Sequence, residues 1–136
     1  MYQIVGAAME VHKVLGRGLA EAIYQEALTI ELSQQSMIVE REKILPIYYK
    51  GQKMQKTYLV DVYYKGIIIE LKSTNSLCSE HRAQLFNYMR ISKTYRGLLI
   101  KFGEKSLHAE RYLYLPEQDH FILLTQENYK EYITDK

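Results

Sequence analysis

Two strand-like runs separated by the dipeptide Lys65-Gly66 constrain the fold more than any other feature of this sequence. The first run is Thr57–Tyr64 and the second is Ile67–Lys72, and both are rich in β-branched and aromatic residues. Because glycine tolerates a positive φ, a Lys-Gly pair suits a two-residue hairpin turn. The sequence therefore predicts an antiparallel hairpin in which Tyr64 pairs with Ile67.

This register brings two carboxylates together. Asp61 is expected to lie directly opposite Glu70, with Cβ atoms about 4.5–5.5 Å apart. Lys72 shares the face of Glu70, because residues two apart in a strand project to the same side. Two carboxylates this close repel each other unless a cation lies between them or one is protonated. We therefore expect Asp61, Glu70 and Lys72 to form one cluster.

The cluster has the composition of a site that cleaves phosphodiester bonds. Hard oxygen ligands favour Mg²⁺ or Mn²⁺ over Zn²⁺, and Mg²⁺ commonly takes one or two carboxylates together with water and substrate phosphate. Lys72 would position the attacking water or neutralise charge on a non-bridging oxygen. The alternative is an exposed Glu70–Lys72 ion pair. Nearly continuous apolar residues in both strands indicate covered faces, where unpaired charges are costly.

The rest of the chain is predicted to add helices and strands around this hairpin. Apolar residues at helical spacing indicate helices at residues 2–15, about 19–35 and about 80–92. The second of these carries apolar residues on opposite faces and is expected to be buried on two sides. Further strands are expected at 38–42, 44–49, 97–102, 111–115 and 121–124, and a short helix at about 126–133. This order predicts an α/β domain with a mixed central sheet.

Composition excludes several classes of protein. The single cysteine, Cys78, rules out an internal disulfide framework and a zinc site built on cysteines, and it fits a reducing cytoplasm. The net charge of +2 gives no strong argument for nucleic-acid binding. The longest uncharged run, Met1–Met9, is far shorter than a membrane span and lacks the basic start of an export signal. We therefore expect a soluble, cytoplasmic protein without a membrane partner.

Three short motifs occur in an order typical of one group of nucleases. Asp61, followed after eight residues by Glu70-Leu71-Lys72, resembles the PD-(D/E)XK nuclease signature, with Val60 in place of the proline. Gly18–Tyr24 (GLAEAIY) resembles the signature of the GxxExxY protein family, a branch of that superfamily. His81–Tyr88 (HRAQLFNY) is similar to the Gln-x-x-x-Tyr helix of RecB-like nucleases.

The resemblance covers most of the chain, roughly residues 4–115. It implies a restriction-endonuclease-like αβββαβ core within a single domain of residues 1–136, with 116–136 as a short extension. The implied activity is metal-dependent hydrolysis of phosphodiester bonds, in DNA rather than RNA, with Mg²⁺ or Mn²⁺ as cofactor. The alternative is a nuclease fold with little turnover that binds nucleic acid or a protein partner. A homodimer would also fit if the Tyr-rich strand at 112–115 lies at a sheet edge.

The resemblance assigns a metal-binding role to the acidic cluster. Asp61 and Glu70 would coordinate the ion, together with the backbone carbonyl of Leu71. Lys72 would be the catalytic lysine. Glu21 would reach the site from the early helix, either as a further acidic ligand or as a partner of a ligand.

The helical motifs would border the site. Gln84, with Tyr88 one turn later, would contact substrate or the catalytic residues, and Tyr24 falls in the other helical motif as a further substrate-binding candidate. From the pattern alone, Gln84 and Tyr88 are more often a packed or solvent-facing pair. Glu21 is equally well explained as a first-turn glutamate favoured by the helix dipole. A basic stripe on the opposite side of the third helix is interpreted as a solvated face; it consists of Arg82, Arg90 and Lys93.

Overall fold

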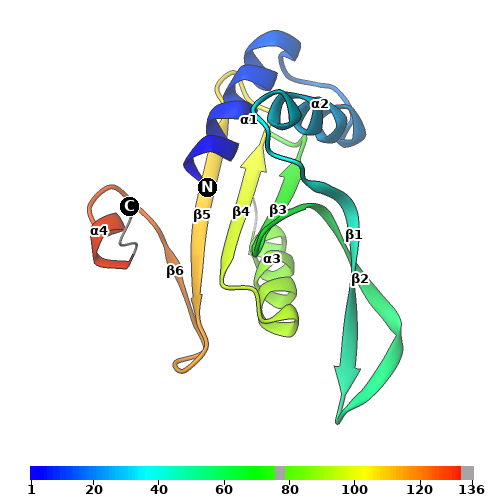
Figure 1. Ribbon diagram of the computed structural model, residues 1–136. Helices are drawn as coiled ribbons and strands as arrows, with labels where there is room; N and C mark the ends of the chain where they lie inside the picture. The colour runs from blue at the N-terminus through cyan, green and yellow to red at the C-terminus, as the bar shows by residue number, and fades with distance from the viewer. Residues whose placement is uncertain (76–78, 133–136) are drawn as a thin grey trace.

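The predicted mixed α/β architecture is confirmed by the computed structural model, which describes residues 1–75 and 79–132 (Figure 1). The elements are α1 (Tyr2–Leu15), α2 (Glu21–Gln34), β1 (Glu40–Tyr49), β2 (Gln52–Tyr64), β3 (Ile67–Lys72), α3 (Ser79–Ser92), β4 (Arg96–Lys101), β5 (His108–Leu115), β6 (His120–Leu123) and α4 (Tyr129–Tyr132). Cys78 lies outside the described residues. Within the described part of the chain, no helix is long and apolar enough to cross a membrane.

The six strands form one sheet in their sequence order, β1-β2-β3-β4-β5-β6. Neighbouring strands are antiparallel except β3 and β4, which are parallel and connected through α3. Because β6 pairs along β5, residues 112–115 lie inside the sheet and do not form the edge that a homodimer through this strand would require. The described edges of the sheet are β1 and β6.

The hairpin between β2 and β3 has the predicted register. Tyr64 pairs with Ile67, and the next two positions pair in step. Lys65 and Gly66 have φ values of 41° and 81°, the two positive values that a type I′ turn requires. A single turn therefore sets which residues of the two strands meet.

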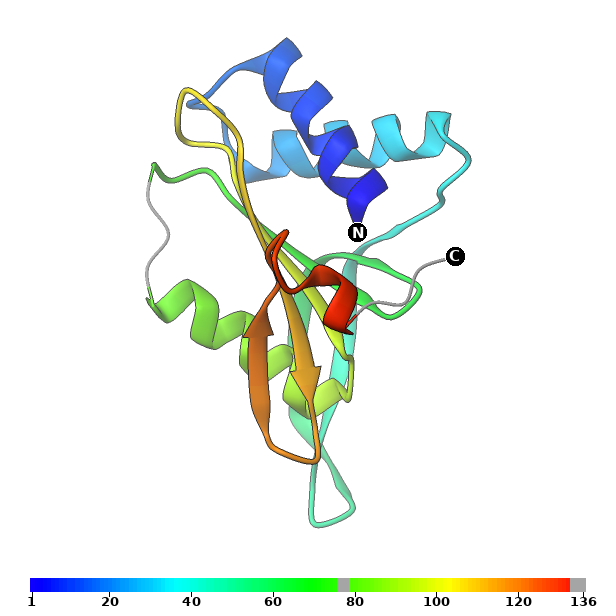
Figure 2. The ribbon, with the colours of Figure 1, turned by 90° about the vertical axis from the view of Figure 1, so that its left-hand side faces the viewer.

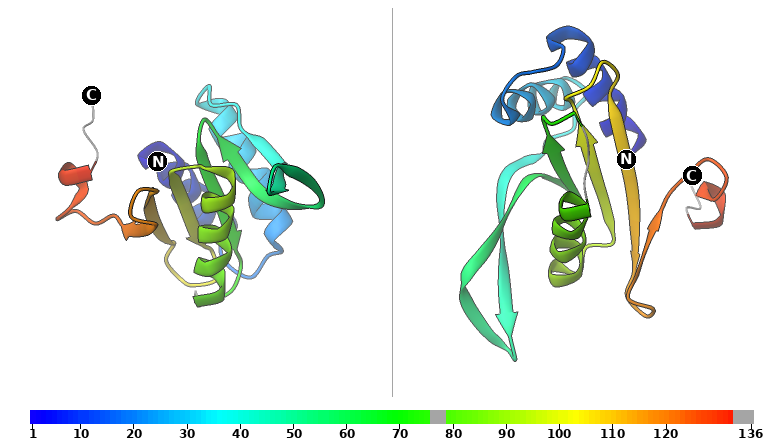
Figure 3. Two further views of the ribbon diagram at one scale, coloured as in Figure 1. Left: turned by 90° about the horizontal axis from the view of Figure 1, so that it is seen from below. Right: turned by 180° about the vertical axis from the view of Figure 1, so that it is seen from behind.

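Helices cover the two faces of the sheet. α1 and α2 form one layer, over a cluster that includes alternate β3 residues such as Ile67, Ile69 and Leu71. α3 covers the opposite face, where Ile68 packs against Leu85 (Figures 2 and 3). The continuous apolar run of β3 is thus explained by burial on both faces.

α2 is buried on only one side, so the prediction of two buried faces is wrong. The helix begins at Glu21, two residues later than expected, and its buried residues are Tyr24, Gln25, Leu28 and Leu32. Ile23 and Ile30 on the other side are 45% and 52% exposed. α2 is an outer layer, and only its inner face meets α1 and the sheet.

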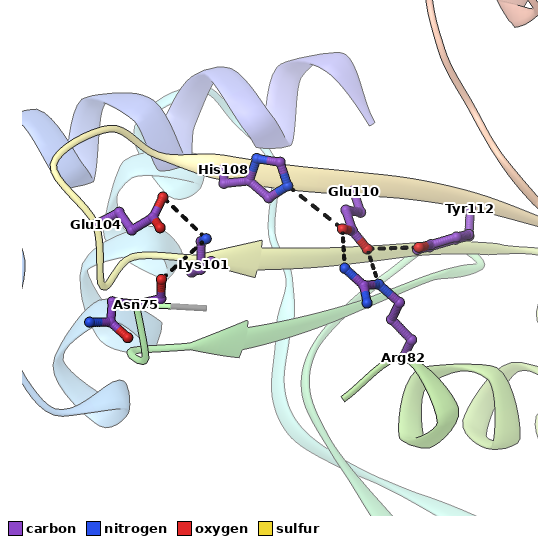
Figure 4. A network of polar contacts seen from close by, with 7 residues as sticks. All are labelled: Asn75, Arg82, Lys101, Glu104, His108, Glu110 and Tyr112. Atoms are coloured by element: carbon purple, nitrogen blue, oxygen red, sulfur yellow. Dashed lines mark hydrogen bonds and ion pairs between the residues drawn. The ribbon is translucent and has the colours of Figure 1, made fainter. Parts of the chain in front are cut away.

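Ion pairs tie α3 to strand β5 and to the turn between β5 and β6, and Figure 4 shows the contact with β5. Arg82 makes two bonds to Glu110 on β5, at 2.8 and 2.7 Å, and Tyr112 donates to the same carboxylate at 2.7 Å. The guanidinium bonds lower the pKa of Glu110 to about 2. Arg90 bonds Asp119 at 3.1 Å. Arg82 and Arg90 of the basic stripe are therefore engaged in ion pairs within the fold, so the stripe is not a purely solvated face.

Candidate functional site

Strand β2 is irregular at Asp61. The pairing of β2 with β3 stops one residue before it, at Val62 and Ile69. On the β1 side, the residue that would oppose Asp61 is Glu42, which has a φ of 50° and falls between two paired positions. The backbone around Asp61 therefore leaves the regular ladder on both sides.

The two carboxylates replace ladder bonds at this irregularity. The Asp61 amide donates to Oε2 of Glu70 at 3.2 Å, and the Leu71 amide donates to Oδ2 of Asp61 at 2.8 Å. Asp61 and Glu70 thus lie side by side where β2 and β3 separate, close to the position that the hairpin register predicts. The N–H and C=O of one strand residue point to the same edge, so the Leu71 carbonyl also faces β2.

The side chains of β2 change faces at the same point. Residues two apart normally share a face, yet Val62 packs in the cluster under α1 and α2 whereas Val60 packs in the cluster under α3. Both valines are fully buried. The part of the β1–β2 hairpin that precedes Asp61 along β2, together with the segment of β1 paired to it, consequently turns toward α3. This part extends past the other strands (Figure 1). Asp61 is the residue at which the side chains of β2 change from one face of the sheet to the other.

Burial and mutual repulsion disfavour negative charge on the acidic pair. Glu70 is 3% exposed, and its pKa is raised to about 8, first by desolvation and then by the Asp61 carboxylate. The pKa of Asp61 is also raised by desolvation, against the lowering effect of its bond from the Leu71 amide. A cation between the two carboxylates would relieve both effects.

The lysine and the helical motif of α3 converge on this pair. Lys72 donates from Nζ to Oε1 of Gln84 at 3.3 Å. The pKa of Tyr88 is raised to about 12, mainly by burial and then by the charges of Glu70 and Asp61, so its hydroxyl lies within their field. The structure therefore brings these predicted residues of β2, β3 and α3 together.

Glu21 adjoins the cluster from the start of α2. Its Oε2 accepts a bond from the Ser73 amide at 3.4 Å, just after β3 ends. Its charge contributes to the raised pKa values of Asp61 and Glu70. Gly18, in the preceding loop, has a φ of 95°, a conformation that favours glycine. That loop brings the first turn of α2 to the end of β3.

Tyr24 lies beneath this loop and not at the surface. Its side chain is fully buried and stacks on Phe102 at a centroid distance of 4.3 Å. Its hydroxyl donates to the Gly16 carbonyl at 2.6 Å and accepts from the Leu19 amide at 3.3 Å. The glycine and tyrosine of the GLAEAIY motif thus shape the loop that presents Glu21, and Tyr24 offers no surface to a ligand in this structure.

Gln25 and Arg41 support the site, although neither belongs to one of the three sequence motifs. Gln25 is 5% exposed and donates from Nε2 to the Asp61 carbonyl at 3.0 Å. Its Oε1 accepts from Nε and Nη2 of Arg41 at 3.3 and 3.1 Å. A signal was present, because Gln25 is a polar residue on the apolar face of α2, one turn after Glu21. These contacts hold the irregular backbone at Asp61.

The donor set suits a hard divalent cation with few protein ligands. Among the described residues, no group of three or more His, Cys, Asp or Glu side chains is arranged to hold a metal ion. Two adjacent carboxylates, each using one oxygen in a backbone bond, leave their other oxygens for a cation such as Mg²⁺, which usually keeps several waters. Asp61 and Glu70 are the residues that would hold such a cation.

Comparison with known proteins gives one family. The family described as the PD-(D/E)XK nuclease superfamily matches residues 1–112. No curated protein matches the chain. One similar solved structure is the crystal structure of SSO0001, with 17% sequence identity and a TM-score of 0.42 over 79% of this chain. The aligned region spans 65% of that protein's length.

Proposed function

The chain belongs to the PD-(D/E)XK nuclease superfamily, and from this membership we propose that it is a divalent-metal-dependent nuclease acting on DNA in preference to RNA. The observation that carries the proposal is the side-by-side placement of Asp61 and Glu70, with Lys72 next along the same strand. We further assign the chain to the GxxExxY branch on its GLAEAIY motif. Its single cysteine fits a cytoplasmic location.

The proposed ligands are the carboxylates of Asp61 and Glu70 and the carbonyl of Leu71, with Mg²⁺ or Mn²⁺ as the ion. A bound divalent ion supplies Lewis acidity to the phosphate and lowers the pKa of water. Glu21 adds negative charge beside these ligands. These donors are hard oxygens, as the chemistry of either ion requires.

Lys72 has two proposed tasks at the scissile phosphate: it orients the attacking water and neutralises charge on a non-bridging oxygen. Its bond to Gln84 restricts the ammonium to the side of the site that faces α3. Hydrolysis adds the elements of water across one P–O bond and leaves a phosphate monoester and a hydroxyl end. Tyr88 borders the same region from the next turn of α3.

The test is cleavage of DNA by purified protein. Plasmid DNA and linear single-stranded DNA are incubated with the wild type in Mg²⁺, in Mn²⁺ and in EDTA, beside equivalent RNA. We expect cleavage only with metal, and its loss in Glu70→Ala and Lys72→Ala. Glu26→Gln and Lys65→Ala, at exposed positions outside the cluster, serve as matched controls and should remain active. Equal cleavage by all five proteins would refute the assignment of the site.

A second candidate function is binding of nucleic acid or a protein partner with little turnover. The observation that favours it is the burial of Glu70 beside Asp61, which raises the pKa of Glu70 and so opposes the charged form that a metal ligand requires. Affinity for DNA that is indifferent to metal and to Asp61→Asn, without cleavage at any pH, would establish this candidate over the nuclease.

A further inference from the structure

The β1–β2 hairpin concentrates positive charge that the whole-chain total conceals. Residues 43–58, which we call the basic hairpin, contain four lysines and no acidic residue. The chain as a whole carries +2, so the residues outside the basic hairpin carry −2. The basic hairpin also contains three tyrosines. It lies next to the acidic cluster because β2 continues from it into Asp61, where the side chains of the strand change faces. Interleaved lysines and tyrosines are typical of surfaces that bind nucleic acid.

A groove of about 510 Å³ runs between the basic hairpin and α3. Lys56 and Tyr58 line it on the β2 side, and Gln84, Asn87 and Tyr88 line it on the α3 side. Glu80, at the start of α3, also borders it. Because Gln84 bonds Lys72, the groove leads directly to the candidate site.

Tyr58 gives this groove an aromatic wall. Its ring is partly buried and lies 4.4 Å from the ring of Tyr88, measured between centroids, with the planes tilted by 44°. The contact with Tyr88 fixes the orientation of Tyr58 while leaving part of its ring in the groove. Asn87, on the opposite wall, has an amide nitrogen that can donate to the edge of a base, while its Oδ1 accepts a bond from Arg90 at 3.1 Å. The groove thus combines a stacking surface with hydrogen-bonding groups.

We propose that this groove binds an unpaired nucleotide next to the scissile phosphate, which makes single-stranded DNA the preferred substrate. Tyr58 stacks on the base and Lys56 contacts the adjoining phosphate. The position of the scissile bond rests on the proposed nuclease function, whereas the binding itself does not. A duplex hides its base faces in the helical stack, so only a single strand or an unpaired end offers a face to Tyr58.

The binding test uses the full chain in EDTA, where no cleavage interferes. Fluorescence anisotropy measures the affinity for a labelled ten-nucleotide oligothymidylate, for the matching oligouridylate and for a blunt ten-base-pair duplex. We expect the single strand to bind at least about tenfold more tightly than the duplex. Lys56→Ala and Tyr58→Leu should each lower the affinity for the single strand about tenfold. Tyr58→Phe keeps the ring and should keep the affinity. Lys105→Ala, in the β4–β5 loop, removes one positive charge away from the groove and is the charge-matched control.

Cleavage assays with metal separate this inference from the nuclease assignment. Faster cleavage of single strands, lost in Tyr58→Leu and retained in Tyr58→Phe, supports the groove. Equal cleavage of single strands and duplexes, unaffected by either groove variant, overturns the groove and leaves the nuclease function intact. Binding that depends on Lys56 and Tyr58 without cleavage supports the groove and removes the nuclease function.

Thermal unfolding of the variants and binding of the oligouridylate complete the test. Thermal unfolding of Tyr58→Leu shows whether a loss of affinity reflects a loss of fold, and the surface variant Lys56→Ala carries the test if it does. Weaker binding of Lys56→Ala and Tyr58→Leu at unchanged stability supports the groove. Unchanged affinity in Lys56→Ala together with duplex-level affinity for single strands overturns it. Stronger binding of the oligouridylate than the oligothymidylate overturns the choice of DNA.

Discussion

Replacing Glu70 by glutamine is expected to stabilise the metal-free protein and to abolish the proposed nuclease activity. The Glu70 carboxyl is almost completely buried beside Asp61, and its pKa is about 8 in the fold against an ordinary value of 4.5. Glutamine has nearly the same shape, carries no charge, and its Oε1 can still accept the bond from the Asp61 amide. The substitution therefore removes the electrostatic cost without opening a cavity.

The size of the effect follows from proton linkage. Since the folded protein holds this proton more tightly than the unfolded chain, Glu70 does not destabilise the fold below pH 4.5, and its cost grows as the pH rises toward 8. At pH 7 the linkage corresponds to at most about 3 kcal/mol. Penetration of water around the pair reduces this to about 1–2 kcal/mol in favour of the glutamine variant. Near pH 4.5 the two proteins should be equally stable.

Guanidinium unfolding followed by circular dichroism at pH 4.5, 7 and 8.5 in EDTA measures this difference. Glu26→Gln, on the exposed face of α2, controls for the loss of a carboxylate. Adding Mg²⁺ should stabilise the wild type and leave Glu70→Gln unchanged, because the proposed metal site requires both carboxylates. A variant that is less stable than the wild type at pH 8.5, or a difference that does not shrink toward pH 4.5, would refute the reasoning.

Three further predictions test the supports of the site and the fold. Gln25→Leu should lower kcat about tenfold at unchanged KM and unchanged circular dichroism, because it releases the β2 carbonyl that positions the acidic pair; full activity in steady-state kinetics would contradict this. Glu110→Gln should lower the free energy of unfolding by about 1–2 kcal/mol at pH 7, as measured by denaturant titration. Because the pKa of Glu110 is lowered to about 2, this difference in stability should vanish as the pH falls from 4.5 toward 2. Gly103→Ala should lower the free energy of unfolding by about 2–3 kcal/mol, because a Cβ there would overlap the Thr74 carbonyl. Gly6→Ala, with open space around its Cβ, is the control and should unfold at no lower denaturant concentration than the wild type.

Local rules were sufficient for the hairpin that carries the acidic pair. The Lys65-Gly66 turn determines the register, and the register determines that Asp61 and Glu70 meet. The strict alternation of side chains was an incomplete guide, because it assumes a regular strand. The positive φ of Glu42 and the face switch at Asp61 break that regularity, and neither leaves a periodic signal in the sequence.

Tertiary packing decided the features that the sequence analysis missed. Apolar residues on both sides of α2 indicate two buried faces, but no layer of the described residues covers Ile23 and Ile30, which are exposed. Gln25 reads as an isolated polar residue until Arg41 and the Asp61 carbonyl are placed beside it. Contacts between distant segments cannot be derived from the spacing of residues within one helix.

The short span of chain between the two carboxylates also bears on how the molecule folds. Asp61 and Glu70 are joined by a tight turn, so bringing them together closes a small loop at little cost in chain entropy. Gln84 and Glu21 arrive only with α3 and α2, from much more distant parts of the chain. The acidic pair is therefore a low-contact-order feature, whereas the desolvation that mainly raises the pKa of Glu70 arises only when the helices bury it. Divalent ions or mildly acidic buffer, which neutralise the pair, should accordingly favour the docking step that buries it.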